Sequence, residues 1–287
     1  MMTKENLGIP SIGTYYQRLH RNQNPHLEQQ KTDNFIKEIL STYKTLFPNP
    51  TTFEFINYGD TEQVYVLGDG ITKKTLLIGQ PRLEKGIVKE EYYNLKKLGE
   101  RYPNLVITPS HYFSNEYREA YLTNYIYQAR CIASQTSGYG VYIPEPYYHF
   151  ENFTEEDSYQ ICKVIIANLI RLYDVDKNLG LAECKIGGGD FILEKEYDNE
   201  PHTEINTLKR MHLIAARKLI NIELKEYINL IKKEFRLVTY YRDIQEKNQS
   251  IIINDKNRIS MTRESIEDGI KLGLKLQEST GHIDLTI

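Results

Sequence analysis

Apolar and polar residues alternate with different periods along the first part of the chain. From residue 32 to residue 47, apolar residues recur every three or four positions, which predicts a helix that ends before Pro48. Between residues 53 and 81, strand-forming residues fall into three runs, separated by Gly59-Asp60 and Gly68-Asp69-Gly70. Turn-forming residues between such runs predict a three-stranded antiparallel meander.

A second helical pattern follows Pro81 and leads into two more strand-like runs. Four apolar residues share one face of this helix: Val88, Tyr92, Leu95 and Leu98. The pattern ends near Pro103, and residues 105–114 and 119–129 then predict two strands. The chain from residue 52 to residue 128 is therefore expected to follow the order β-β-β-α-β-β.

The second half of the chain mixes helical and strand patterns. Residues 131–153 contain Gly, Pro, Ser and Tyr and predict a connection between two lobes. A helix with an apolar face is expected over residues 155–173, two short strands over 180–193, a helical pair between about 208 and 235, and a closing helix over 263–277. We expect three segments: an N-terminal arm and helix (1–50), a small β-rich lobe (51–128) and a larger, mainly helical lobe (129–287).

Composition narrows the class of protein. Of the 287 residues, 40% are hydrophobic and 26% charged, as in ordinary soluble globular proteins. The net charge of −3 gives no overall basic footprint for nucleic acid or anionic membranes. The chain has neither an apolar leader pattern near its start nor an apolar run long enough to cross a bilayer, and its three cysteines lack metal-ligand spacing. We expect a cytoplasmic protein with no membrane partner.

The stretch from Gly180 to Leu193, GLAECKIGGGDFIL, holds the strongest candidates for chemistry. Glu183 and Lys185 are two positions apart, so on a strand their side chains would point to the same face. Asp190 follows three consecutive glycines. Two different chemistries fit these residues, and both remain open at this point.

The order of elements over residues 52–128 resembles the small lobe of the protein-kinase-like superfamily, especially its aminoglycoside and choline phosphotransferase branch. The resemblance is based on three segments: Gly59-Asp60-Thr61-Glu62-Gln63-Val64-Tyr65 at the phosphate-loop position, Glu91 with Leu95 and Leu98 in the helix, and Leu122-Thr123-Asn124-Tyr125-Ile126 at the hinge. It implies an α+β, two-lobed fold, with a five-stranded antiparallel small lobe carrying one helix and a mainly helical large lobe. It also implies a cleft that binds ATP and Mg²⁺, with cofactor contacts from Gly59, Thr61, Glu91, Thr123, Asn124 and Tyr125.

The same resemblance assigns roles in the second half of the chain. Glu183 stands at the position of the family's catalytic-loop His, Lys185 at the catalytic Asp, and Asp190 at the metal-binding Asn. Asn206 occupies the place of the metal-binding Asp of the Asp-Phe-Gly motif, so Mg²⁺ would be bound by Asp190 and Asn206. Phosphoryl transfer needs carboxylates to orient the attacking hydroxyl and to bind Mg²⁺. The altered residues therefore predict a diverged phosphotransferase or a pseudokinase, with a nucleotide and a small-molecule or protein substrate as partners.

The alternative is a nuclease of the PD-(D/E)xK family, which the strand bearing Glu183 and Lys185 resembles. There the acid binds Mg²⁺, the lysine activates water, and Asp174 or Asp176 is the missing acidic partner. This interpretation requires Asp174 within about 5 Å of Glu183 on an adjacent strand, whereas the kinase-like interpretation places it at the end of a helix. Four basic residues on an expected amphipathic helix could approach DNA phosphates or form a solvated face: Lys209, Arg210, Arg217 and Lys218. Nucleic acid is expected as a partner only in this case, and a non-catalytic interaction protein is a third alternative.

A second local match to a kinase catalytic loop occurs near the C-terminus. Residues 241–248, YRDIQEKN, resemble that loop. Only 39 residues follow Asn248, too few for the helical remainder of a kinase large lobe. The glycine-flanked stretch is therefore the preferred candidate.

Overall fold

The computed structural model describes most of the chain, in segments that form two compact units. The described residues are 25–47, 51–58, 62–81, 84–126, 129–133, 147–149, 155–182, 188–195, 208–233, 255–277, 279, 281, 283 and 285–286. Unit 1 comprises those between Met1 and Lys97 and between Ile107 and Ile126, and unit 2 comprises those between Leu98 and Val106 and between Tyr127 and Ile287.

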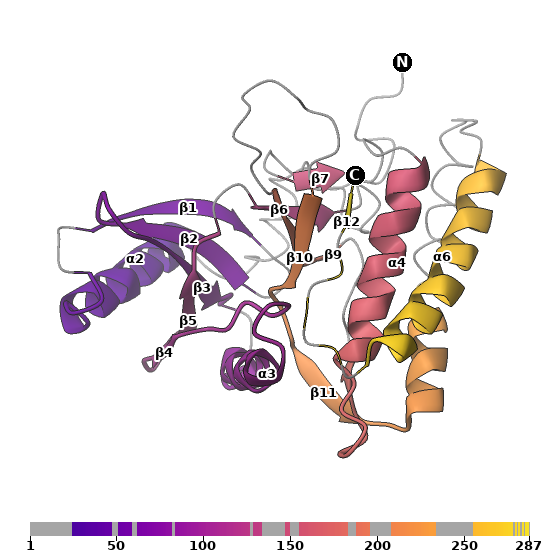
Figure 1. Cartoon of the computed structure of the whole chain (residues 1–287). Helices are drawn as coiled ribbons and strands as arrows, with labels where there is room; N and C mark the ends of the chain where they lie inside the picture. The colour runs from indigo at the N-terminus through magenta and orange to yellow at the C-terminus, as the bar shows by residue number, and fades with distance from the viewer. Residues whose placement is uncertain are drawn as a thin grey trace. The chain divides into compact units, whose positions relative to one another are not determined.

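Unit 1 is built on a five-stranded sheet in which each pair of neighbours is antiparallel (Figure 1). Its strands lie in the order β1-β2-β3-β5-β4. Their bounds are Thr52–Tyr58 for β1, Glu62–Gly68 for β2, Lys73–Gly79 for β3, His111–Ser114 for β4 and Glu119–Asn124 for β5. Helix α3 (Ile87–Arg101) lies between β3 and β4 in the chain. The predicted meander and the predicted order β-β-β-α-β-β are confirmed.

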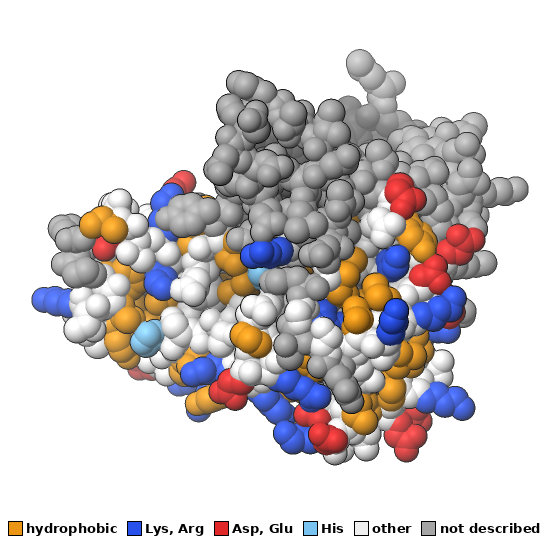
Figure 2. Space-filling view, in the orientation of Figure 1, with side chains coloured by type: hydrophobic (Ala, Val, Ile, Leu, Met, Phe, Trp, Pro, Cys, Tyr) orange, Lys and Arg blue, Asp and Glu red, His pale blue; other side chains and the backbone are white. Residues whose placement is uncertain are grey.

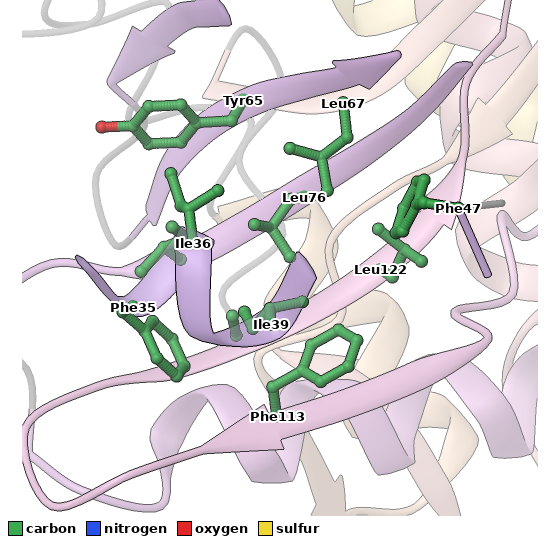
Figure 3. Packing of buried hydrophobic residues seen from close by; sticks show 11 residues of the cluster. Phe35, Ile36, Ile39, Phe47, Tyr65, Leu67, Leu76, Phe113 and Leu122 are labelled. Carbon is green, nitrogen blue, oxygen red and sulfur yellow. The ribbon is translucent and has the colours of Figure 1, made fainter. Parts of the chain in front are cut away.

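Helix α2 (Pro25–Thr42) covers one face of this sheet. Tyr65, Leu76 and Leu122 are cross-strand partners and therefore lie side by side on that face. Figure 3 shows the helix side chains Phe35, Ile36 and Ile39 meeting these strand residues. The cluster contains eleven buried residues: Phe35, Ile36, Ile39, Phe47, Tyr65, Leu67, Leu76, Ile78, Phe113, Ala120 and Leu122. The helix begins and ends earlier than the predicted 32–47. It ends earlier because residues 43–46 form a turn, which brings Phe47 into this core.

The opposite face of the sheet is contacted by α3. The ring of Tyr92 lies 5.6 Å from that of Tyr112 and 6.5 Å from that of Tyr121, measured between centroids. Val88 and Leu95, one helix turn to either side, are also buried, which confirms the predicted apolar face. The sheet of unit 1 is therefore packed between two helices, with α2 on one face and α3 on the other.

Unit 2 combines helices with two sheets. Helices α4 (Glu155–Arg171) and α6 (Asp255–Lys275) lie side by side (Figure 1), and residues 224–233 form another helix. A five-stranded sheet has the order β12-β10-β9-β6-β7, and a two-stranded sheet pairs β11 with β8. The strand bounds are Ala129–Ala133 for β6, Tyr147–His149 for β7, Leu179–Ala182 for β8, Gly188–Lys195 for β9, Leu208–Leu213 for β10, Lys218–Asn221 for β11 and Leu285–Thr286 for β12.

Several predictions for the second half are corrected by these strands. The expected connection 131–153 contains most of β6 and all of β7. The expected helical pair over 208–235 is wrong in its first half, where β10 and β11 lie and only residues 224–233 are helical. Both strands are held by ladders to β9 and β8, and such tertiary pairing overrides a weak local helical pattern. The second lobe is therefore less purely helical than expected.

Two strand boundaries of unit 1 also differ from the prediction. β4 begins at His111 and not at residue 105, because Pro109 has no N–H to donate to a ladder. The predicted strand 119–129 ends at Asn124, and β6 begins at Ala129. Over the part of the chain that the structure describes, no helix is both long and apolar enough to cross a bilayer.

Candidate functional site

The residues predicted to bind a cofactor lie in unit 1, and those predicted to take part in catalysis lie in unit 2. The structure describes Glu91, Thr123, Asn124, Tyr125 and Asp190. The others lie outside the described residues: Gly59, Thr61, Glu183, Lys185 and Asn206, as does the segment 241–248. Each unit is considered separately below.

Glu91 is presented to the interior of unit 1 by helix α3. Its side chain is 0% exposed, and Val88 and Leu95 are buried on the same helix face. A buried carboxylate is costly unless it is held by hydrogen bonds or opposite charge. Glu91 therefore differs from its neighbour Glu90, which is exposed, in being fully buried.

The predicted hinge begins at the end of β5. The ladder between β3 and β5 extends as far as the pair Lys74 and Asn124. The Lys74 ammonium donates a hydrogen bond to the Asn124 side-chain oxygen at 2.6 Å, and the Lys73 ammonium lies 5.5 Å from the centroid of the Tyr125 ring. Thr123 is buried. These contacts position the strand end and the residue that follows it.

The sheet face opposite α2 carries a half-buried surface next to this strand end. Cross-strand pairing places Val66, Thr75 and Thr123 in one row of that face. A second row contains Val64, Leu77 and Tyr121. Val64, Val66, Thr75 and Leu77 are all half-buried, whereas the residues that face α2 on the same two strands are mostly buried. We call these four residues the β2–β3 shelf.

In the chain, the catalytic-loop candidate of unit 2 lies between strands β8 and β9. The strands that pair with these two, β11 and β10, are joined to each other by a short connection. β8 ends at Ala182 and β9 begins at Gly188. β11 pairs with β8, and β10 pairs with β9. Residues 214–217 join β10 to β11, and the N–H of Ile214 donates to the carbonyl oxygen of Asp190 at 2.9 Å. The 214–217 connection therefore joins the partner of β9, which follows the catalytic-loop candidate in the chain, to the partner of β8, which precedes it.

Asp190 faces a cation from this connection. One carboxylate oxygen of Asp190 lies 3.6 Å from a guanidinium nitrogen of Arg217. The side chains are 3% and 14% exposed, so little water screens the two charges. The sequence pattern predicts an amphipathic helix at Arg217, but the residue lies in a connection between strands, and its side chain is largely buried. The sequence carried no signal for this pairing.

Asp174, the acidic partner required by the nuclease interpretation, lies in a turn just after α4. Its main chain pairs with Leu179, the first residue of β8. Its carboxylate accepts a hydrogen bond from the N–H of Lys177 at 3.2 Å and lies 3.4 Å from the guanidinium of Arg101. Because β8 rises about 3.3 Å per residue, Asp174 is about 10 Å from the end of β8 that precedes Glu183. Asp174 is therefore engaged in closing a turn at the far end of that strand.

A third group of polar residues, missed in the sequence, surrounds a cavity of about 190 Å³ in unit 1. Arg118 lines it and forms a buried ion pair with Glu28 of α2. Burial alone would raise the pKa of the Glu28 carboxyl, but hydrogen bonds and charge from Lys31 and Arg118 lower it below its usual value. Glu119 also lines the cavity and accepts hydrogen bonds from the Gly86 N–H at 2.8 Å and from a tyrosine hydroxyl. Glu28 and Arg118 are 90 positions apart, so no local motif could reveal the pair.

The charges on the visible surface do not gather by sign. On the face shown in Figure 2, Lys and Arg side chains are interspersed with Asp and Glu. Across the described residues, no three side chains of His, Cys, Asp or Glu come together in a way that could hold a metal ion. A metal bound at Asp190 would therefore need further ligands from other segments.

Comparisons with known proteins give remote similarity to solved structures. No protein-family model matches the chain, and no curated protein matches it. The autoinhibited serine kinase domain of the giant muscle protein titin is similar to it, with a TM-score of 0.37 and 9% sequence identity. The match covers 60% of this chain and 46% of the titin kinase chain. A similarity of this size does not indicate an activity; what the structure describes is a mixed α+β protein with an antiparallel five-stranded sheet.

Proposed function

We propose that this chain is a diverged kinase-like protein that binds a nucleotide on unit 1, and that it acts as a pseudokinase or as a phosphotransferase with an altered catalytic loop. The observation that carries the proposal is the β2–β3 shelf beside the end of β5. The order of elements around it supports the proposal as well. ATP is the nucleotide that the resemblance implies.

The shelf has the character of a surface for a nucleotide base. Purine bases are flat and bind to apolar surfaces, with a few polar groups at their edge. Val64, Val66 and Leu77 supply apolar surface that is half-buried. The other face of the sheet is filled by the core under α2. On the shelf's own face, the ring of Tyr92 in α3 contacts Tyr112 of β4 and Tyr121 of β5, so β2 and β3 are the part of this face proposed to receive a ligand.

The polar edge would come from the residues after β5. The ladder to β3 ends at the pair Lys74 and Asn124, next to the row that contains Thr123 and the shelf residue Thr75, and Tyr125 follows directly in the chain. Polar groups at the end of a strand can hydrogen-bond the edge of a base held on the shelf. Thr123, Asn124 and Tyr125 are therefore proposed as the base-contacting residues.

Phosphoryl transfer is expected to be weak or absent. Lys185 stands where the resemblance places the catalytic carboxylate, and a lysine cannot accept a proton from an attacking hydroxyl while it is charged. Glu183, Lys185 and Asp190 remain the candidates for any residual activity. We expect nucleotide binding with little or no release of phosphate from ATP.

Titration with ATP, ADP and GTP, followed by thermal unfolding, tests the proposal. A ligand at about 100 times its dissociation constant should stabilise the protein by about 2.7 kcal/mol. For a protein of this size, that corresponds to a rise in melting temperature of about 5–10 °C. The absence of any shift with all three nucleotides would refute the proposal.

A pair of variants locates the binding surface. Thr75→Phe places a ring in the middle of the shelf and should weaken nucleotide binding by about tenfold or more, or about 1.4 kcal/mol. Ile71→Phe adds the same ring in the β2–β3 turn, where the native side chain is 81% exposed, and should bind like the wild type. Circular dichroism establishes that both variants are folded. Equal affinity of all three proteins would show that the shelf is not the site.

The nuclease alternative is not favoured by the position of Asp174. The nuclease alternative can be tested directly by incubating plasmid DNA and Mg²⁺ or Mn²⁺ with the wild type and with Lys185→Ala. Cleavage by the wild type that Lys185→Ala loses would replace the kinase-like proposal with a metal-dependent nuclease.

A further inference from the structure

The metal site implied by the kinase-like resemblance does not fit the surroundings of Asp190. Mg²⁺ requires near-octahedral coordination by oxygen ligands, and it binds poorly where a positive charge already lies beside a ligand. The Arg217 guanidinium lies 3.6 Å from the Asp190 carboxylate, and arginine stays charged at all ordinary pH values. A metal ion bound to the Asp190 carboxylate would either displace the Arg217 guanidinium or be repelled by its positive charge.

The main chain holds the two residues in this arrangement. Asp190 lies at the start of β9, where its carbonyl accepts the N–H of Ile214. Arg217 follows three residues later, immediately before β11. Because ladders to β9 and β8 hold both ends of the 214–217 connection, the ion pair does not depend on two freely moving surface side chains.

Burial strengthens this pairing. An exposed ion pair exchanges readily with water and salt, but side chains that are 3% and 14% exposed are largely shielded from both. Removing the cation would take an opposite charge away from a buried carboxylate, which is unfavourable. Arg217 thus supplies the positive charge that a divalent ion would otherwise bring to Asp190.

We infer that the Arg217 guanidinium takes the place of a divalent metal ion at Asp190. The inference concerns unit 2 alone and does not rest on the proposed function.

The inference is tested by thermal unfolding with and without MnCl₂. The wild type should be unaffected by Mn²⁺ beyond the general effect of salt. Arg217→Gln should melt at a lower temperature, and Mn²⁺ should restore part of the loss by neutralising Asp190. The double variant Asp190→Asn/Arg217→Gln, which lacks both charges, serves as the control and should not respond to Mn²⁺.

Two results would overturn the inference. One is stabilisation of the wild type by Mn²⁺ that Asp190→Asn abolishes, because the carboxylate would then bind metal beside Arg217. The other is a folded Arg217→Gln that gains nothing from Mn²⁺. If Arg217→Gln does not fold, the comparison of the wild type with Asp190→Asn decides alone.

Discussion

Substitution of Gly273 by alanine tests how closely α4 and α6 pack in unit 2. An ideal Cβ at Gly273 would lie 2.6 Å from the Cβ of Ile170 and 2.8 Å from the carbonyl oxygen of Ala167. Gly269, one turn earlier, makes an equally close approach to Ile166 and to the carbonyl of Lys163. The two glycines allow the helix backbones to approach each other closely.

The sign of the effect depends on two opposing contributions. Alanine is favoured over glycine inside a helix by about 1 kcal/mol. Carbon atoms in contact stand about 3.5–4.0 Å apart, so the new methyl group would push the helices apart by about 1 Å. The opposing atoms belong to main chain and to a β-branched residue, which cannot rotate away. Overpacking of this kind costs about 1–3 kcal/mol, so after the gain in helix propensity we expect Gly273→Ala to lower the free energy of unfolding by up to about 2 kcal/mol.

Denaturant unfolding followed by circular dichroism measures this change. The melting temperature should fall by up to about 8 °C. Lys275→Ala, an exposed position of the same helix, is the control and should change stability by less than about 0.5 kcal/mol. The double variant Gly269→Ala/Gly273→Ala should lose less than the sum of the single losses, because the first methyl group already separates the helices.

A stabilised Gly273→Ala would refute this reasoning. An increase of about 1 kcal/mol is what helix propensity alone predicts. That result would mean that the close contact between α4 and α6 does not exist in solution.

Three further substitutions address the buried groups of each unit. Glu28→Gln removes one partner of the buried pair with Arg118 and should cost about 3–5 kcal/mol near neutral pH. Because the pKa of Glu28 is lowered in the folded state, its contribution is present above about pH 4.5 and is lost as the pH falls through the folded-state pKa. Urea unfolding at a series of pH values should therefore show the difference from the wild type shrinking in acid. Leu76→Ala opens a cavity in the core under α2 and should cost about 2–5 kcal/mol in the same assay. Arg171→Met removes a buried donor to the carbonyl of Ser279, and hydrogen exchange should accelerate around that residue.

Contradicting outcomes are specific to each substitution. A pH-independent difference for Glu28→Gln would show that the carboxyl has an ordinary pKa in the folded protein. A loss for Leu76→Ala no larger than that for the exposed Leu27→Ala would contradict the core. Unchanged exchange near Ser279 in a folded Arg171→Met would mean that the arginine does not anchor that segment.

Local patterns in the sequence determined the order of elements in unit 1. The turn between β2 and β3 shows why this was possible. Asp69 accepts hydrogen bonds from the N–H groups of Ile71 and Thr72, and Gly70 has a φ of 84°, which favours glycine. These preferences act between neighbouring residues, so a turn and its flanking strands can be read from a short stretch. The apolar face of α3 was predicted for the same reason, since helix periodicity is local.

The tertiary structure alone decided the chemistry around Asp190. Arg217 was assigned to a helix because residues 208–221 have a weak helical pattern, but β9 and β8 provide strand partners that outweigh it. Asp190 and Arg217 are distant in sequence and meet only because β10 and β11 join beside them. Glu28 and Arg118 are brought together in the same way by the packing of α2 on the sheet. The energy of an ion pair depends on distance and burial in space, which sequence spacing does not encode, so both pairs required the folded chain.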